Sequence, residues 1–258
     1  MSEYEKASKG SYYLFLSQMV AIIGGLVALI LFSAYIGANV LGLAKNANVS
    51  TSISAGFNFT SLNAGSVLSQ MPVSLLNSVI NAVIVLIVAG AVVGFVEFTL
   101  MLYGWKVLSE FNSSEYHTPY VGSVMSLIGF LLVVPPSAFM INAVKGAIVS
   151  YQLSQTVPAQ ILAEVLTASI PIFIGMLILL AGYIMVLIGY WRLGSQFNST
   201  LIKAAIILLI ISIVISIFST ILPLLPGILD IVSVILLTAG LYSVSKKTKL
   251  QGSSQTSL

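Results

Sequence analysis

The chain has 258 residues, of which 58% are hydrophobic and only 7% carry a formal charge. A soluble domain has about 25% charged residues and could not cover its surface with so few. Ten Lys and Arg against seven Asp and Glu residues give a net charge of +3, too small for a basic nucleic-acid-binding surface. The sequence contains no Cys, which excludes disulfide bonds and thiolate metal sites. We therefore predict an all-α integral membrane protein, multi-pass in the cell membrane, with lipid as its main partner and no nucleic acid.

Six segments are long and apolar enough to cross a bilayer core, which needs about 20 residues per helix. Lipid offers no hydrogen-bond partners to backbone groups, so each segment is expected to be a helix. The predicted spans are about Tyr13–Val40, Val73–Trp105, Tyr120–Val144, Val165–Trp191, Ala204–Leu222 and Gly227–Ser245.

The basic residues predict the orientation of these spans. Eight of the ten fall on one side of the predicted topology, and only Lys45 and Lys145 fall on the other. The positive-inside rule then places both termini in the cytoplasm. The chain divides into a cytoplasmic N-terminus (1–12), three hairpins of the same orientation and a cytoplasmic Lys/Ser-rich tail. The hairpins are 13–110, with an outer Asn/Ser/Thr-rich loop at about 45–71, then 111–196 and 197–245, and the tail is 246–258.

The outer loop of the first hairpin carries two N-x-Ser/Thr sequences, which begin at Asn48 and Asn58. Because this loop is predicted to face outward, both asparagines are possible glycosylation sites.

A ten-residue segment occurs twice, at 105–114 and at 191–200. The two copies share five identical residues at an offset of 86, and a weaker third copy lies at 240–246. Trp105 and Trp191 are predicted to anchor helix ends at the headgroups, with Lys106 and Arg192 stabilised at the negative end of the helix dipole. Ser or Asn in the following turn is expected to cap the next helix. The alternative is that the two loops bind a ligand at the cytoplasmic face.

The segment 189–198 (GYWRLGSQFN), two closely spaced spans after it and the ending Gly240-Leu241-Tyr242 together resemble a known family. This is the uncharacterised archaeal family of multi-span membrane proteins catalogued as domain of unknown function 973. The resemblance is best from about Leu177 to Val244. It implies the helical architecture and brings no known activity.

Glu97 lies about eight residues before Trp105, hence roughly 12 Å inside the predicted inner interface. An acid at this depth is expensive and is a candidate functional site. The repeat pairs it with Tyr183 (97 + 86), and we expect a hydrogen bond between the two side chains. A protonated acid that joins helices and a proton or cation relay are both open interpretations.

Small residues predict where helices approach one another closely. Gly90 and Gly94 form a GxxxG motif on the same helix face as Glu97, and Gly24 and Ala28 form a similar pair in the first span. Such pairs can serve contacts within one chain or between chains.

Three prolines in the predicted outer half and the lack of known catalytic motifs also bear on function. Pro135-Pro136 and Pro171 lie at similar depth, and their kinks could open an outer vestibule or simply serve packing. A single His, His117, and the absence of HExxH, Walker A, GxGxxG and GxSxG patterns argue against a metal centre, a cofactor and enzymatic activity.

These features favour a non-catalytic membrane protein that acts as a structural or accessory subunit or associates with itself or other membrane proteins. The alternative is a small-solute, proton or cation channel or transporter that uses Glu97. A polar-lined cavity that reaches Glu97 would favour transport, and a dry, tightly packed bundle would favour the accessory role.

Overall fold

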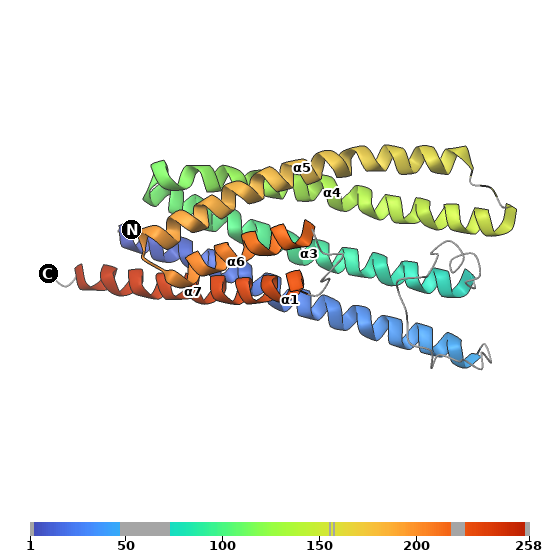
Figure 1. Ribbon diagram of the computed structural model, residues 1–258, viewed down its shortest axis with the longest axis horizontal. Coiled ribbons are helices and arrows are strands. Elements are labelled where there is room, and N and C mark those ends of the chain that lie inside the picture. The colour runs from blue at the N-terminus through green and yellow to red at the C-terminus, as the bar shows by residue number, and fades with distance from the viewer. Residues whose placement is uncertain (1–2, 47–72, 155, 157, 218–224, 256–258) are drawn as a thin grey trace. The chain divides into compact units, whose positions relative to one another are not determined.

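The structure is a computed structural model, and it describes residues 3–46, 73–154, 156, 158–217 and 225–255. In this part of the chain every regular element is an α-helix (Figure 1). The helices are α1 (Glu3–Asn46), α3 (Val73–Phe111), α4 (Ser113–Ser154), α5 (Ala159–Gln196), α6 (Thr200–Ile217) and α7 (Leu225–Gln255). The predicted glycosylation sites Asn48 and Asn58 lie outside the described residues.

Five of these helices are long and apolar enough to cross a membrane, namely α1, α3, α4, α5 and α7. This confirms the prediction of an all-α chain with several helices of membrane-spanning length. Helix α6 has 18 residues and is a shorter apolar helix, so its crossing stays a prediction, as does the orientation of the termini.

Large apolar side chains are exposed along these helices, among them Ile30, Phe139, Leu166, Phe173 and Ile231. A soluble protein rarely exposes contiguous apolar surface on this scale. Hydrocarbon is a suitable solvent for such faces, so the exposed residues agree with a multi-pass membrane protein.

The chain forms two compact units. Helices α1, α3, α4 and α5 each contribute residues to both. Unit 1 comprises Met1–Ile23, Val93–Phe130 and Met176–Leu258, and it therefore contains all of α6 and α7. Unit 2 comprises Gly24–Val92 and Leu131–Gly175. The hydrophobic core described below belongs to unit 1.

Close glycine contacts join helices that follow one another in the chain. A methyl group built on Gly104 of α3 would lie 3.0 Å from the Gly10 carbonyl oxygen of α1, and one on Gly182 of α5 would lie 2.5 Å from the Gly122 carbonyl oxygen of α4. A methyl group on Gly240 of α7 would lie 2.6 Å from Ile202 of α6. Without a Cβ atom, these positions let helix backbones pack directly together.

Three of the helices also share a burial pattern at the end of unit 1 where the charged residues lie. In each, a packed glycine precedes a buried large residue, which precedes an exposed one. The three copies are Gly104-Trp105-Lys106, Gly189-Tyr190-Trp191 and Gly240-Leu241-Tyr242. The first two are offset by 85 residues, whereas the two tryptophans of the sequence repeat are offset by 86.

The turn between α5 and α6 has three residues, 197–199, whereas Asn112 alone separates α3 from α4. Asn198 has a φ of 50°, in the left-handed region. The Ser199 N–H donates to the Gly194 carbonyl oxygen at 2.8 Å, and the Asn198 N–H donates to that of Ser195 at 3.3 Å. This is a Schellman motif, which ends α5. Ser199 Oγ then accepts the Ile202 N–H at 3.5 Å, so the predicted serine cap of the next helix is confirmed.

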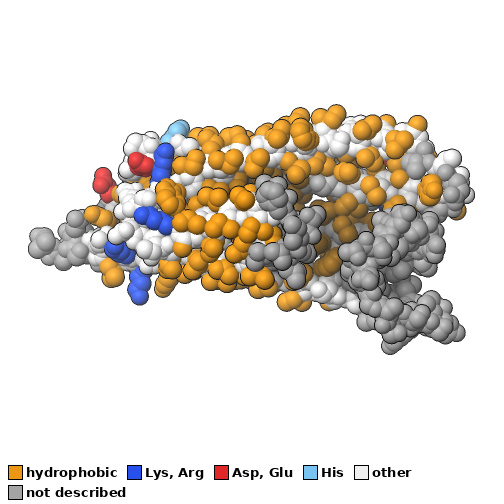
Figure 2. Space-filling model, viewed as in Figure 1, with side chains coloured by type: hydrophobic (Ala, Val, Ile, Leu, Met, Phe, Trp, Pro, Cys, Tyr) orange, Lys and Arg blue, Asp and Glu red, His pale blue; other side chains and the backbone are white. Residues whose placement is uncertain are grey.

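The first and last helices bring the two ends of the described chain to the same end of unit 1 (Figure 1). Ser8 of α1 and Ser245 of α7 hydrogen-bond to each other. Charged side chains gather at this end on the face seen in Figure 2. The distribution is the one expected for helices whose termini lie on one side of a membrane.

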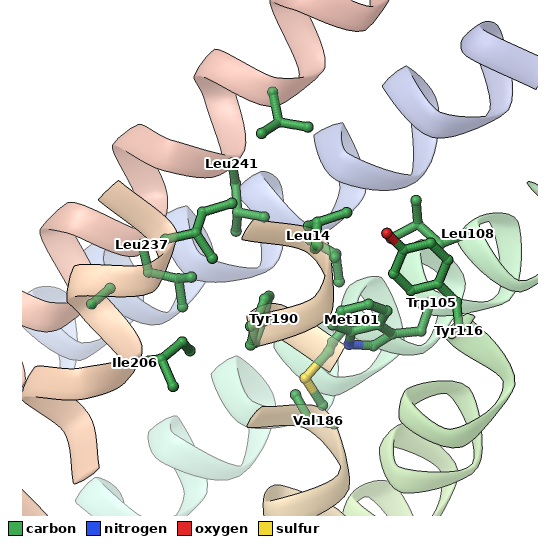
Figure 3. Packing of buried hydrophobic residues seen from close by; sticks show 14 residues of the cluster. Leu14, Met101, Trp105, Leu108, Tyr116, Val186, Tyr190, Ile206, Leu237 and Leu241 are labelled. Carbon is green, nitrogen blue, oxygen red and sulfur yellow. The ribbon is translucent and has the colours of Figure 1, made fainter. Parts of the chain in front are cut away.

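The core of unit 1 is a cluster of buried side chains from all the helices that contribute to it (Figure 3). Trp105 is fully buried, with its ring 5.1 Å from that of Tyr190 in an edge-to-face arrangement and 6.0 Å from that of Tyr116. Aromatic pairs of this kind add about 0.5–1.5 kcal/mol to the burial of their apolar area. Met101, Val186, Tyr190 and Leu237 belong both to this core and to the wall of the cavity that carries the candidate site.

Candidate functional site

A cavity of about 240 Å³ lies inside unit 1 and is lined by residues of all six helices. Its wall contains one ionisable carboxyl group, from Glu97, four other polar side chains and eight aliphatic, aromatic or thioether side chains. The lining residues are Gln18, Ala21, Glu97, Phe98, Met101, Ser126, Tyr183, Val186, Leu187, Tyr190, Leu209, Val234 and Leu237.

Glu97 and Tyr183, which the repeat offset paired, both line this cavity. No hydrogen bond joins their side chains in the described structure, although one was expected. The phenol of Tyr183 is partly exposed, at 38%. The two residues therefore share a cavity without forming a direct link between helices.

Gln18 and Tyr190 are cavity residues that the sequence did not single out. The Gln18 amide Nε2 donates to the Tyr190 hydroxyl oxygen at 3.4 Å and so connects α1 to α5. Both side chains are buried. The one available signal was Gln18 itself, since an amide inside an uncharged, apolar span needs a hydrogen-bond partner in hydrocarbon.

Trp105 was predicted to anchor its helix at the membrane surface, but the structure buries it completely. Its indole Nε1 is buried and has no hydrogen-bond partner among the described residues. Figure 3 shows this nitrogen on the ring edge next to Met101, which lines the cavity. A buried donor without a partner costs about 1–3 kcal/mol.

Trp191 is exposed, at 44%, as an interface aromatic would be. Its neighbour Arg192 binds Glu115 of α4, with Nε 3.6 Å from the carboxylate and an η nitrogen 2.9 Å from the carbonyl oxygen. Lys106, the corresponding residue of the first copy, is also exposed. Among the four predicted anchors, Trp105 is the one that the structure removes from the surface.

The two repeated turns lie against each other at the charged end of unit 1. Phe111 and Phe197 stack with their rings 6.4 Å apart, and the Tyr116 hydroxyl donates to Gln196 Oε1. A surface pocket of about 580 Å³ beside them is lined by Asn112, Glu115, Trp191, Arg192, Ser195 and Gln196. The two turns therefore pack against each other, and their polar side chains also line a shallow surface pocket.

The predicted small-residue pairs have different surroundings. A methyl group built on Gly94 would lie 2.8 Å from the Phe130 ring of α4, so Gly94 packs against an aromatic side chain. Gly90 has open space around it. Ala28 is buried, and Gly24 is half-buried. A methyl group built on Gly10, Gly104, Gly122 or Gly182 would lie 3.0 Å or less from a carbonyl oxygen of another helix. These glycines were not singled out because isolated glycines form no visible motif.

Unit 2 contains a separate groove of about 700 Å³ between α4 and α5. Pro136 and Pro171 both line it, so the two proline-bearing segments do flank an open space, as the vestibule interpretation requires. Polar side chains in its wall are Asn142, Gln160, Glu164 and Thr167.

In the described ranges, no three His, Asp or Glu side chains lie together. Among the cavities described above, the one around Glu97 places a carboxyl group in a largely apolar wall. Its carboxyl can hold a proton or the positive charge of a ligand, and its apolar walls exclude bulk water from that charge.

The family model for "Protein of unknown function (DUF973)" matches residues 1–258. The chain belongs to this family. The match covers the first hairpin as well as the segment 177–244 on which the sequence resemblance was strongest. No curated protein and no solved structure matches the chain. Family membership therefore places this DUF973 protein among proteins of unknown function and assigns it no activity.

Proposed function

We propose that this DUF973 protein is a non-catalytic, multi-span membrane protein that carries a small solute, proton or cation across the membrane through a site at Glu97. The observation that carries the proposal is the cavity of about 240 Å³ whose wall includes the Glu97 carboxyl group. A tightly packed bundle built only for support would leave no such space.

The position of the carboxyl supports this role. Ionisable groups inside membrane-spanning helices are costly, face protein or water, and mark ion and proton pathways. Glu97 lies in α3 between the apolar residues Val96 and Phe98, well inside the apolar stretch of that helix. Tyr183, Tyr190, Gln18 and Ser126 supply hydroxyl and amide groups in the same cavity.

The experiment is flux through the purified protein in liposomes. A pH-sensitive dye inside the vesicles reports proton entry under an imposed potential, and a sodium-sensitive dye reports sodium entry. We expect flux with the unmodified protein and its loss with Glu97→Gln, which keeps the side-chain shape and removes the charge. Glu110→Gln is the matched control, because Glu110 is exposed at the end of α3 and lies outside the cavity.

Equal flux through Glu97→Gln and the unmodified protein would overturn the proposal. So would the absence of proton, sodium and small-solute flux in vesicles that contain folded, correctly inserted protein.

A structural role as a self-associating subunit is the second candidate, and Gly90 favours it. Gly90 is exposed with open space beside it, although it belongs to a GxxxG motif that permits close helix approach. If a second chain packs there, Gly90→Leu should convert an oligomer to a monomer in light scattering of the detergent-solubilised protein. A monomer before and after the substitution would exclude this role.

A further inference from the structure

The composition of the Glu97 cavity indicates which class of ligand it would hold. We propose that it binds a small monovalent organic cation, an ammonium ion attached to a compact hydrophobic body. This inference rests on the proposed function for its transport role and names the substrate class of the same site.

The charge of the ligand follows from the wall of the cavity. Glu97 is the only Asp, Glu, Lys, Arg or His residue among the thirteen that line it. One carboxylate without a basic partner in the wall matches one positive charge. An anionic ligand would meet that carboxylate with no cation beside it, and a dication would keep one charge unmatched in an apolar enclosure.

The hydrophobic body follows from the remaining residues. Three aromatic side chains contribute to the wall, Phe98, Tyr183 and Tyr190. Aromatic rings attract ammonium groups through their π electrons and also bury apolar surface. Six aliphatic residues, Met101, Gln18 and Ser126 complete the lining. A bare Na⁺ or K⁺ ion would use the five oxygen-bearing side chains of the wall and leave its apolar majority without a contact.

The size of the ligand follows from the volume. About 240 Å³ corresponds to the space of roughly eight water molecules at about 30 Å³ each. Drug-sized ligands occupy pockets of about 300–1,000 Å³. The cavity is therefore suited to a single-ring or short-chain amine and too small for a bulky lipophilic cation.

The test is a ¹⁹F NMR titration of the detergent-solubilised full-length protein with 4-fluorobenzylammonium at pH 7. Micelles without protein supply the baseline for partitioning into detergent. 4-Fluorobenzyl alcohol is the neutral ligand of nearly the same shape. We expect saturable binding of the ammonium ion at least tenfold tighter than that of the alcohol.

Two variants and a control locate the binding. Glu97→Gln should weaken ammonium binding at least tenfold and leave binding of the alcohol unchanged. Ala21→Leu, which adds volume to the cavity wall, should weaken both ligands. Ala91→Leu is the matched control, because residue 91 lies on α3 outside the cavity, and it should bind like the unmodified protein. Size-exclusion chromatography verifies that each variant is folded.

Three results would overturn the inference: no saturable ammonium binding, equal affinity for the alcohol, or full ammonium binding by folded Glu97→Gln. The flux assay separates this failure from that of the proposed function. If proton or sodium flux depends on Glu97 but no ammonium binding is found, the proposed substrate class is wrong and the transport role remains. If ammonium binding depends on Glu97 but neither the ammonium ion nor any other tested ion crosses the membrane, the transport role is wrong and the binding site remains.

Discussion

Ser8 and Ser245 hydrogen-bond reciprocally between the first and last helices. The Ser8 hydroxyl donates to the Ser245 carbonyl oxygen at 2.9 Å, and the Ser245 hydroxyl donates to the Ser8 carbonyl oxygen at 3.0 Å. Both side chains are buried although 237 positions separate them. The pair therefore closes the helical arrangement of unit 1 at its charged end.

We predict that Ser8→Ala and Ser245→Ala each lower the free energy of unfolding by about 0.5–1.5 kcal/mol, since each removes one buried interhelical hydrogen bond. The double variant should lose less than the sum of the two, because the pair acts as a unit. Equilibrium unfolding by SDS in mixed micelles measures these values. Ser243→Ala, an exposed residue on the same helix, is the control; additive losses for the pair would contradict the coupling.

The same pair makes the position of the termini testable. Because the sequence contains no Cys, single cysteines at the exposed positions Lys9 and Lys249 are clean reporters. We expect both to react with a membrane-impermeant maleimide from the same side of sealed vesicles, and a cysteine at Gln160 to react from the other. Labelling of the two terminal sites from opposite sides would mean that the chain crosses the membrane an odd number of times.

The glycine contact between α4 and α5 predicts a large effect from a small substitution. In Gly182→Ala the new methyl group would lie 2.5 Å from the Gly122 carbonyl oxygen, so the two backbones must separate. We expect a loss of about 1–3 kcal/mol, typical of overpacking, as a lower midpoint of thermal unfolding in detergent. Gly25→Ala has nothing within 4 Å of its new methyl group and should leave the midpoint unchanged. Equal midpoints for the two variants would contradict the packing.

The two tryptophans should differ in solvent access. Trp105 is fully buried, and Trp191 is 44% exposed. With Trp191→Phe, the remaining Trp105 should fluoresce at shorter wavelength and resist quenching by acrylamide. With Trp105→Phe, the emission of Trp191 should shift to longer wavelength and be quenched several times more strongly. A Trp105 that is quenched as readily as Trp191 would show that the core around α3 is open.

Hydropathy was sufficient to predict helices of spanning length, because about 20 apolar residues in a row have few alternatives in lipid. It could not predict how each helix is rotated about its own axis. One residue corresponds to a rotation of about 100°. The repeat aligned Trp105 with Trp191, but the packed glycines Gly104 and Gly189 are offset by one residue less, and Trp105 is buried as a result.

The candidate site was predictable in part for the same reason. Glu97 was evident because a single acid in an apolar helix is conspicuous, and Tyr183 followed from the repeat. Leu209, Val234 and Leu237 also line the cavity, but aliphatic residues on apolar helices carry no mark that separates a cavity wall from a lipid-facing surface. Only the packing of six helices distinguishes them.

The length of the described helices has a consequence for the membrane itself. No Asp, Glu, Lys, Arg or His residue lies between His117 and Lys145 of α4, or between Glu164 and Arg192 of α5, which leaves 27 residues in each stretch. At about 1.5 Å per residue each is roughly 40 Å long, against a hydrocarbon layer of about 30 Å. Such helices must tilt or thicken the surrounding lipid, so in a bilayer with regions of unequal thickness the protein should collect in the thicker ones.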